Sequence, residues 1–174
     1  MTAIEIGISL AMSSKSAREF YCFVRNEFAY LEADDGPNPN CNVISVFYES
    51  IFRRGYPFWR GCGYWNVFLN FDLEWDDYDN LFALSVARRT GPSEVDTSKV
   101  VHLGEILTVL DASWPSGWRN FDTSEGPEQV KRYAKAIKPY AREIFIPQDR
   151  EAAGFQGFSW YAGVKARTND RDRQ

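Results

Sequence analysis

Hydrophobic and polar residues alternate near the start of the chain, from Ile4 to Met12. This period of two predicts a strand with one buried face. Ser13 or Ser14 then offers a cap for a helix that is predicted to end at about Leu31. The apolar side of this helix comprises residues at helical spacing: Phe20, Val24, Phe28 and Leu31.

Three segments in the middle of the chain have the composition of strands. Val43 to Arg53 is rich in β-branched and aromatic residues, Tyr64 to Trp75 alternates most regularly, and Leu81 to Arg89 follows an acidic turn. The short links between these segments favour an antiparallel meander. Residues 54–63 contain three glycines and a proline, which predicts a long hairpin connection rich in aromatic residues.

The alternation from Tyr64 to Trp75 predicts which side of that strand is buried. The predicted core face comprises Trp65, Val67, Leu69, Phe71, Leu73 and Trp75. The predicted solvent face comprises Tyr64, Asn66, Phe68, Asn70, Asp72 and Glu74. A shift of one residue would exchange the two faces, so the burial of these side chains tests the assignment.

The second half of the chain has a weaker pattern. After a break at residues 90–93, Val100 to Leu110 fits either a strand or a short helix. The last clear helix is predicted to begin at Gly126-Pro127-Glu128, where proline suits the first helical position. Its apolar spacing continues past Pro139, so the helix either kinks there or divides into two short helices with a common buried face. From Val164 onward the chain is polar without periodicity, which predicts a flexible tail.

These elements and the length of 174 residues predict a single α+β domain. The domain is expected to span residues 1–163, with a mainly antiparallel sheet packed by an N-terminal and a C-terminal helix. Residues 164–174 form the expected polar tail. Aromatic residues make up 16% of the chain, so many rings must lie in the core or on a recognition surface.

The charge and the cysteines indicate the environment. A formal net charge of −4 disfavours general binding to nucleic acid through its phosphate backbone. No apolar run approaches the roughly 20 residues that span a bilayer, and the N-terminus has no export signal. Cys22, Cys41 and Cys62 are odd in number and far apart, which fits a reducing compartment. We therefore expect a cytoplasmic protein without membrane association.

Most residue patterns that carry enzyme chemistry are missing from the sequence. The one histidine, His102, lies in an apolar stretch, where a satisfied, partly buried imidazole is the alternative to a catalytic one. The cysteines lack the close pair of a zinc site, and neither a phosphate-binding loop nor a nucleophile elbow occurs. We therefore expect no metal, no cofactor and no conventional catalytic residues.

An acidic cluster provides one alternative. Asp72 and Glu74 share a face of the predicted strand, and Asp76 follows. Carboxylates two positions apart lie about 7 Å from each other, near the separation used in glycoside hydrolysis, and neighbouring tyrosine and tryptophan rings could stack on a sugar. These three residues would serve a small carbohydrate-active enzyme or a sugar-binding module. The simpler interpretation is a solvated face that ends in an acidic turn.

Basic side chains suggest two further surfaces. A stripe on the last helix is either a solvated face or a docking surface for an acidic partner. It comprises Lys131, Lys135, Lys138 and Arg142. Arginines on strands can clamp phosphates, which gives a second alternative function, a small-ligand or nucleotide-binding module. The candidates are Arg53, Arg54, Arg88 and Arg89.

Aromatic and arginine side chains also gather in two predicted loops. Such side chains either cap the core or form binding hot spots. The candidate partner-binding residues are Tyr56, Phe58, Trp59, Arg60, Trp114, Trp118 and Arg119.

Four stretches in order carry a resemblance between Phe20 and Pro147. They are the helix that ends near Leu31, the strands Val43–Phe47 and Trp65–Phe71, and the closing helix with Tyr140–Pro147. In this order they resemble small bacterial α+β proteins of unknown-function families that include toxin-immunity proteins. The resemblance implies an acidic, aromatic-rich protein without an active site that binds and blocks a partner enzyme.

The leading functional hypothesis is therefore a non-catalytic protein-binding module, an immunity or inhibitor protein that blocks a partner enzyme. A toxin is one candidate partner. The sequence identifies neither the partner nor the oligomeric state.

Overall fold

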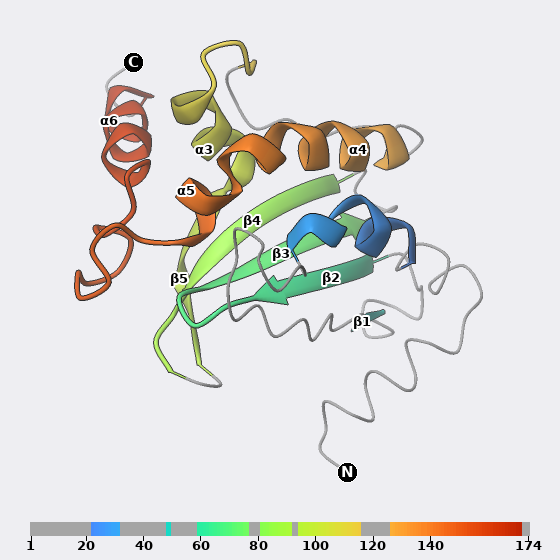
Figure 1. Cartoon of the computed structure of the whole chain (residues 1–174), viewed down its shortest axis with the longest axis horizontal. Coiled ribbons are helices and arrows are strands. Elements are labelled where there is room, and N and C mark those ends of the chain that lie inside the picture. Colours follow the sequence, from blue (N-terminus) through green and yellow to red (C-terminus); the bar gives the residue numbers. More distant parts are fainter. Residues whose placement is uncertain are drawn as a thin grey trace.

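An antiparallel sheet forms the centre of the computed structural model, which describes residues 22–31, 48–49, 59–76, 81–91, 94–115 and 126–171. Its strands follow one another in chain order (Figure 1). They are β1 (Tyr48–Glu49), β2 (Trp59–Trp65), β3 (Leu69–Asp76), β4 (Leu81–Arg89) and β5 (Val95–His102). The α+β class with an antiparallel sheet is confirmed. The predicted strand Ile4–Met12 and most of Val43–Arg53 lie outside the described residues.

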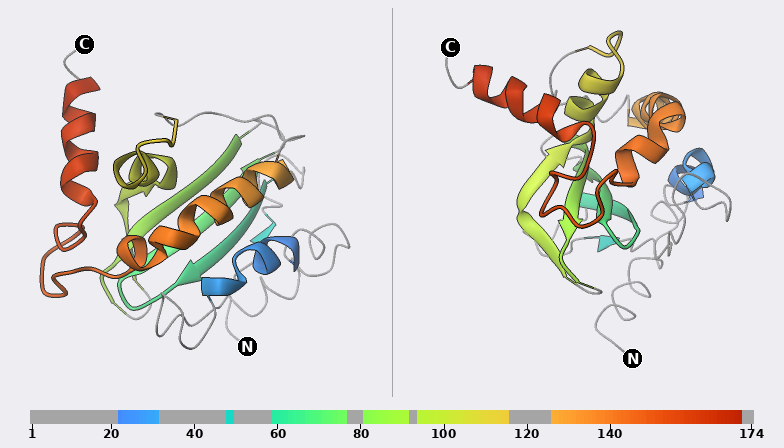
Figure 2. Two further views of the ribbon diagram at one scale, coloured as in Figure 1. Left: turned by 45° about the horizontal axis from the view of Figure 1, so that its top comes forward. Right: turned by 60° about the vertical axis from the view of Figure 1, so that its left-hand side comes forward.

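The structure also contains several helices. They are α3 (Leu103–Leu110), α4 (Gly126–Ile137), α5 (Ala141–Phe145) and α6 (Tyr161–Arg171), with short 3₁₀ turns η1 (Ala29–Leu31) and η3 (Lys138–Tyr140). The helical segment 22–27 and η1 lie beside α4, and α6 lies beside α3 (Figure 2). Tyr30 links η1 to α4, because its hydroxyl donates a hydrogen bond to the carbonyl of Ala134 at 2.9 Å.

The segment predicted as one strand from Tyr64 to Trp75 forms parts of two strands, β2 and β3, joined by a turn at residues 66–68. Asn66 holds the turn: its Oδ1 accepts hydrogen bonds from the backbone N–H groups of Phe68 and Leu69, both at 2.8 Å. Asparagine favours such turns because its side chain replaces a backbone partner. The prediction of one strand was wrong because the apolar alternation passes through the turn without a break.

The turn changes which side chains are buried. The predicted core positions that are confirmed are Leu69, Phe71 and Leu73. Val67, also predicted in the core, lies in the turn and is 63% exposed, and Trp65 is only half-buried. Tyr64 and Asn66 were predicted to face solvent, yet both are buried. Tyr64 pairs with Phe71 across the two strands, which places it on the core face.

Asn66 also joins the turn to the end of α5. Its Nδ2 donates a hydrogen bond to the carbonyl oxygen of Phe145 at 2.9 Å. Carbonyls in the last turn of a helix lack partners within the helix, so they need one from elsewhere. Because Asn66 is 2% exposed, bulk water cannot take over its role.

Three predictions for the second half of the chain are resolved. Val100–Leu110 contains both alternatives, since β5 ends at His102 and α3 begins at Leu103. Around Pro139 the chain forms η3, so α4 and α5 are two helices with buried residues on a common side. Within the segment expected as a polar tail, α6 continues to Arg171 and Val164 is buried against the core, while residues 172–174 lie outside the described chain.

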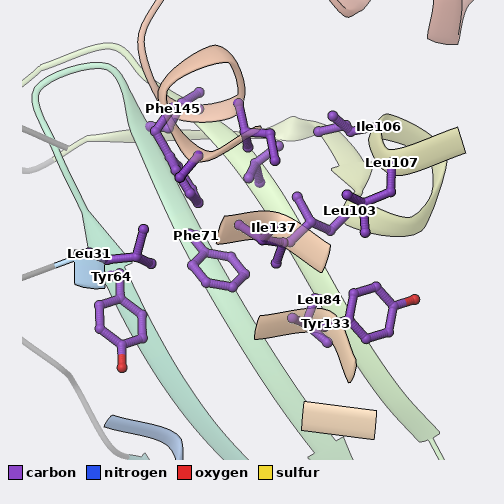
Figure 3. Packing of buried hydrophobic residues seen from close by; sticks show 14 of the residues in the cluster. Leu31, Tyr64, Phe71, Leu84, Leu103, Ile106, Leu107, Tyr133, Ile137 and Phe145 are labelled. Atoms are coloured by element: carbon purple, nitrogen blue, oxygen red, sulfur yellow. The ribbon is translucent and has the colours of Figure 1, made fainter. Parts of the chain in front are cut away.

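Aromatic rings meet at the centre of the core. The ring of Phe71 lies 5.5 Å from the rings of both Phe28 and Phe145 and 5.8 Å from that of Tyr64, centroid to centroid. Figure 3 shows Phe71 between Tyr64 of β2 and Ile137 of α4. Aromatic pairs of this kind contribute about 0.5–1.5 kcal/mol beyond their buried area. One ring therefore connects two strands, the first helical segment and α5.

The edge strand β5 departs from regular pairing near its middle. Ala87 of β4 pairs with Val100, whereas the next residue of β4 pairs with Asp96, so residues 97–99 form a bulge. The Asp96 carboxylate accepts hydrogen bonds from the backbone N–H and the hydroxyl of Ser98, and these bonds hold the pKa of Asp96 below its usual value. A bulged edge is poorly suited to pairing with a strand of another chain.

Replacing Leu69 by alanine is expected to lower the free energy of unfolding by about 2–5 kcal/mol, because the change removes transfer energy and leaves a cavity. Val67→Ala, at the exposed turn position, is expected to change it by less than about 0.5 kcal/mol. Urea denaturation of both variants measures the two losses. Equal losses would show that both residues share one buried face, as a single strand requires.

Asn66→Ala is expected to cost about 2–4 kcal/mol of unfolding free energy, because it leaves buried N–H and C=O groups without partners. Asn70→Ala is the matched control. Asn70 is half-buried and accepts a hydrogen bond from Arg89 at 3.1 Å, so its loss should cost at most about 1 kcal/mol. Thermal unfolding followed by calorimetry compares the variants, and a smaller loss for Asn66→Ala than for Asn70→Ala would contradict the role given to Asn66.

Candidate functional site

The acidic residues Asp72, Glu74 and Asp76 lie on β3, which is central in the sheet. Their positions alternate with the buried positions 69, 71 and 73, so they belong to the opposite face of the sheet. Asp72 lies between Gly63 of β2 and Ser85 of β4, and Glu74 likewise has a glycine and an alanine as its cross-strand partners. Small residues therefore border Asp72 and Glu74 on both sides, whereas Asp76 pairs with Trp59 and Leu81.

His102 extends this arrangement to the edge of the sheet. It pairs with Ser85, so Asp72, Ser85 and His102 form a row across three strands. Burial lowers the pKa of His102, while the carboxylate of Glu105 opposes the shift. The imidazole is therefore neutral at pH 7. In a catalytic triad the imidazole stands between the hydroxyl and the carboxylate, whereas here the serine is in the middle.

Only three of the predicted partner-binding residues fall within the described chain: Trp59, Arg60 and Trp114. The prediction that Trp59 and Arg60 lie in a loop is wrong, because β2 begins at Trp59 and both residues pair with β3. The backbone pairing with β3 continues along the full length of β2, and the glycines of β2 do not interrupt it. The predicted residues outside the described chain are Tyr56, Phe58, Trp118 and Arg119, together with Arg53 and Arg54.

Trp114 packs between helices. Its ring lies 4.9 Å from the ring of Tyr133, and the guanidinium of Arg132 lies 4.9 Å from its centre. A Cβ on Gly104 would lie 3.1 Å from the Tyr133 hydroxyl, so glycine permits this close approach of α3 to α4. Burial raises the pKa of Tyr133 to about 12. These contacts favour the interpretation of Trp114 as a cap on the core.

The basic stripe of α4 and α5 is exposed, as its spacing predicted. Lys131 forms an ion pair with Glu128 at 3.0 Å, but exposed pairs of this kind stabilise little. The ammonium of Lys138 lies 5.7 Å from the centre of the Tyr30 ring. Neither contact points to a partner.

Arg88 and Arg89 end β4 on opposite faces of the sheet, because consecutive strand residues alternate. On one face, the guanidinium of Arg89 lies 5.4 Å from the ring of Trp65 and donates a hydrogen bond to Asn70. Arg88 packs beside Phe68 instead. The two arginines therefore do not converge on one ligand as a phosphate clamp would require.

A different pair of arginines approaches one aromatic ring. The guanidinium carbons of Arg88 and Arg150 each lie 5.7 Å from the centre of the Phe68 ring, and Arg88 also lies 5.6 Å from the ring of Phe158. We call Phe68, Arg88, Arg150 and Phe158 the arginine–aromatic cluster. It adjoins the β2–β3 turn, where Val67 is exposed.

The segment between α5 and α6 brings two members of the cluster to the sheet (Figures 1 and 2). The carbonyl of Gly157 accepts hydrogen bonds from the N–H groups of Gln148 and Asp149, at 2.8 and 3.3 Å. A Cβ on Gly157 would overlap the carbonyl oxygen of Asp149, so glycine is required here. The closed loop positions Arg150 and Phe158, which sequence reasoning missed because no local pattern links them to Phe68.

Arg88 is the more buried of the two charges in the cluster. It is half-buried, and its Nη1 donates a hydrogen bond to the carbonyl of Phe68 at 3.0 Å. It forms no ion pair with any residue that the structure describes. Burial lowers its pKa, although a guanidinium stays protonated at neutral pH. Such a group is suited to bind an anion.

Two other kinds of site were sought in the described part of the chain. There, no three His, Cys, Asp or Glu side chains are grouped so that they could hold a metal ion. None of the helices in the described ranges has both the length and the apolar character needed to cross a membrane. Cys22 is a free, exposed cysteine.

Comparison with models of protein families, with characterised proteins and with solved structures gives no match to this chain. Function must therefore be argued from the geometry itself.

The pKa of His102 is expected to lie below 6.5, since burial disfavours the charged imidazole. A lower pKa in the folded state means that the unfolded chain binds the proton more tightly, so the free energy of unfolding should fall as the pH drops below about 6.5. As the chain has one histidine, a single imidazole signal in an NMR titration reports this pKa. His102→Gln is the control. It should flatten the pH dependence of the unfolding free energy between about pH 5 and pH 6.5, the range in which histidine titrates. A measured pKa above 6.5 would contradict the desolvation argument.

Proposed function

We propose that the protein is a non-catalytic protein-binding module, an immunity or inhibitor protein that blocks a partner enzyme, and that it binds through the arginine–aromatic cluster. The supporting observation is a pair of guanidinium groups beside the Phe68 ring, next to Val67, whose side chain is 63% exposed. Arginine and aromatic side chains are enriched at the centres of protein interfaces, where a few residues supply most of the binding free energy.

The cluster is also held in place before any partner binds. Asn66 fixes the turn that carries Phe68, and the hydrogen bonds to Gly157 close the loop that carries Arg150. The guanidinium of Arg88 is confined between two rings and a backbone carbonyl. Side chains that are already ordered lose less conformational entropy on binding, which favours affinity.

A carbohydrate-active enzyme or sugar-binding module is the second candidate function. It is favoured by the small residues that border Asp72 and Glu74 on both neighbouring strands. Small neighbours would let a sugar ring approach Asp72 and Glu74 closely. Trp65, the cross-strand partner of Asn70, lies on the same face of the sheet as these acidic positions.

The test begins with a partner that co-purifies with the tagged protein from its native host and is then identified and purified. Arg88→Ala and Arg150→Ala are each expected to weaken the complex by about 2 kcal/mol, as hot-spot residues do, and to reduce inhibition of the partner's activity accordingly. Arg167→Ala on α6 removes the same charge from an exposed position and should leave affinity unchanged. Titration calorimetry measures the affinities, and circular dichroism checks the folding of each variant.

Unchanged affinity in both cluster variants would exclude the cluster as the interface. A partner enzyme that keeps full activity in the complex would exclude inhibition. Turnover of an oligosaccharide, lost in Asp72→Asn and retained in Arg150→Ala, would replace the binding function by the second candidate.

A further inference from the structure

The environment of Arg88 indicates what kind of group its partner supplies. A guanidinium has five N–H donors, and the bond to the Phe68 carbonyl uses one nitrogen, Nη1. The rings of Phe68 and Phe158, whose centres lie 5.7 and 5.6 Å from the guanidinium carbon, offer no strong acceptor. The remaining donors therefore require water or a ligand, at a position where packing has already displaced part of the solvent.

Arg150 adds a second positive charge on the same phenyl ring. Its guanidinium is exposed and lies as far from the ring centre as that of Arg88, at 5.7 Å. An anion bound beside the Phe68 ring would be attracted by both positive charges. A planar anion with two oxygens also matches the parallel N–H groups of a guanidinium.

Resting on the proposed function, we propose that Arg88 and Arg150 bind a carboxylate side chain in an acidic segment of the protein partner, while Val67 and Phe68 contact an apolar side chain next to that carboxylate. The contact would place a charge-assisted hydrogen bond beside a desolvated apolar surface, which is the usual composition of a hot spot.

Charge and surface favour a protein carboxylate over a nucleic acid. The chain carries a net charge of −4, and Asp149 and Glu151, both exposed, flank Arg150 in the sequence. A long polyanion would meet these charges and the net negative charge along its whole length, whereas a single carboxylate at Arg88 and Arg150 meets fewer repelling groups. The exposed Val67 at the turn also fits an apolar side chain better than a ribose–phosphate backbone.

The test uses the whole protein labelled with ¹³C and ¹⁵N and three probes at constant ionic strength. They are a capped pentapeptide in which two glutamates flank a leucine, the same peptide with glutamines, and inorganic phosphate. The glutamate peptide is expected to shift the side-chain NMR signals of Arg88, Arg150 and the Val67 methyls, and to bind at least about tenfold more tightly than the glutamine peptide, as a charge-assisted bond implies.

Variants connect the signal to the cluster. Arg150→Ala, at an exposed position, should weaken binding of the glutamate peptide at least about fivefold without loss of folding, and Arg88→Lys should weaken it through loss of the planar donor pair. Arg167→Ala should bind like the unmodified protein.

Three results would overturn the inference: equal binding of the two peptides, tighter binding of phosphate than of the glutamate peptide, or peptide binding that both cluster variants leave unchanged. Each is distinguishable from failure of the proposed function, because the effect of Arg88→Ala and Arg150→Ala on the partner complex is measured separately. Conversely, if no partner enzyme is found, the peptide measurement still tests whether Arg88 and Arg150 bind a carboxylate.

Discussion

The buried side chain of Asn66 makes the contacts on which the rest of the structure depends. Its oxygen holds the β2–β3 turn through two backbone N–H groups, and its amide nitrogen binds the last carbonyl of α5, that of Phe145. Both ends of a buried amide are thus used, and removal of either partner would leave a polar group without compensation. One residue therefore determines the pairing of two strands and the position at which a helix ends.

The same constraint assembles the arginine–aromatic cluster. Phe68 and Val67 belong to the turn that Asn66 holds, while Arg150 follows closely after the helix end that Asn66 binds. Gly157 then returns the chain so that the ring of Phe158 reaches the guanidinium of Arg88. The two sides of the cluster, which are remote in sequence, thus meet because a single hydrogen-bonded amide joins their supporting elements.

The sequence predicted the parts of the fold that depend on local periodicity. The buried side of the first helical segment, the bounds of β4 and the start of α4 all agree with the structure, because apolar spacing reports the direction of the core. Apolar spacing could not locate the turn at Val67, since hydrogen bonding by Asn66 overrides it. It also missed β5, whose exposed polar residues show no alternation, and α6, whose anchor is mainly Val164.

The candidate site was less predictable for the same reason. Arg88 was identified as an anion-binding candidate, but its expected neighbour Arg89 faces the other side of the sheet. Its actual neighbour, Arg150, lies in an irregular loop closed by a glycine carbonyl, and no periodic pattern marks such a loop.

The charge distribution bears on how a protein of this kind would select a partner. An overall charge of −4 gives an acidic partner no long-range attraction, so electrostatic steering would not accelerate its approach. The arginine pair acts only at contact. There a carboxylate would replace water beside Arg88, and the rings of Phe68 and Phe158 would exclude the remaining water. In the proposed complex, affinity would therefore come from slow dissociation rather than fast association. Selectivity would then rest on the match between one carboxylate, one apolar neighbour and a cluster that the fold has already ordered.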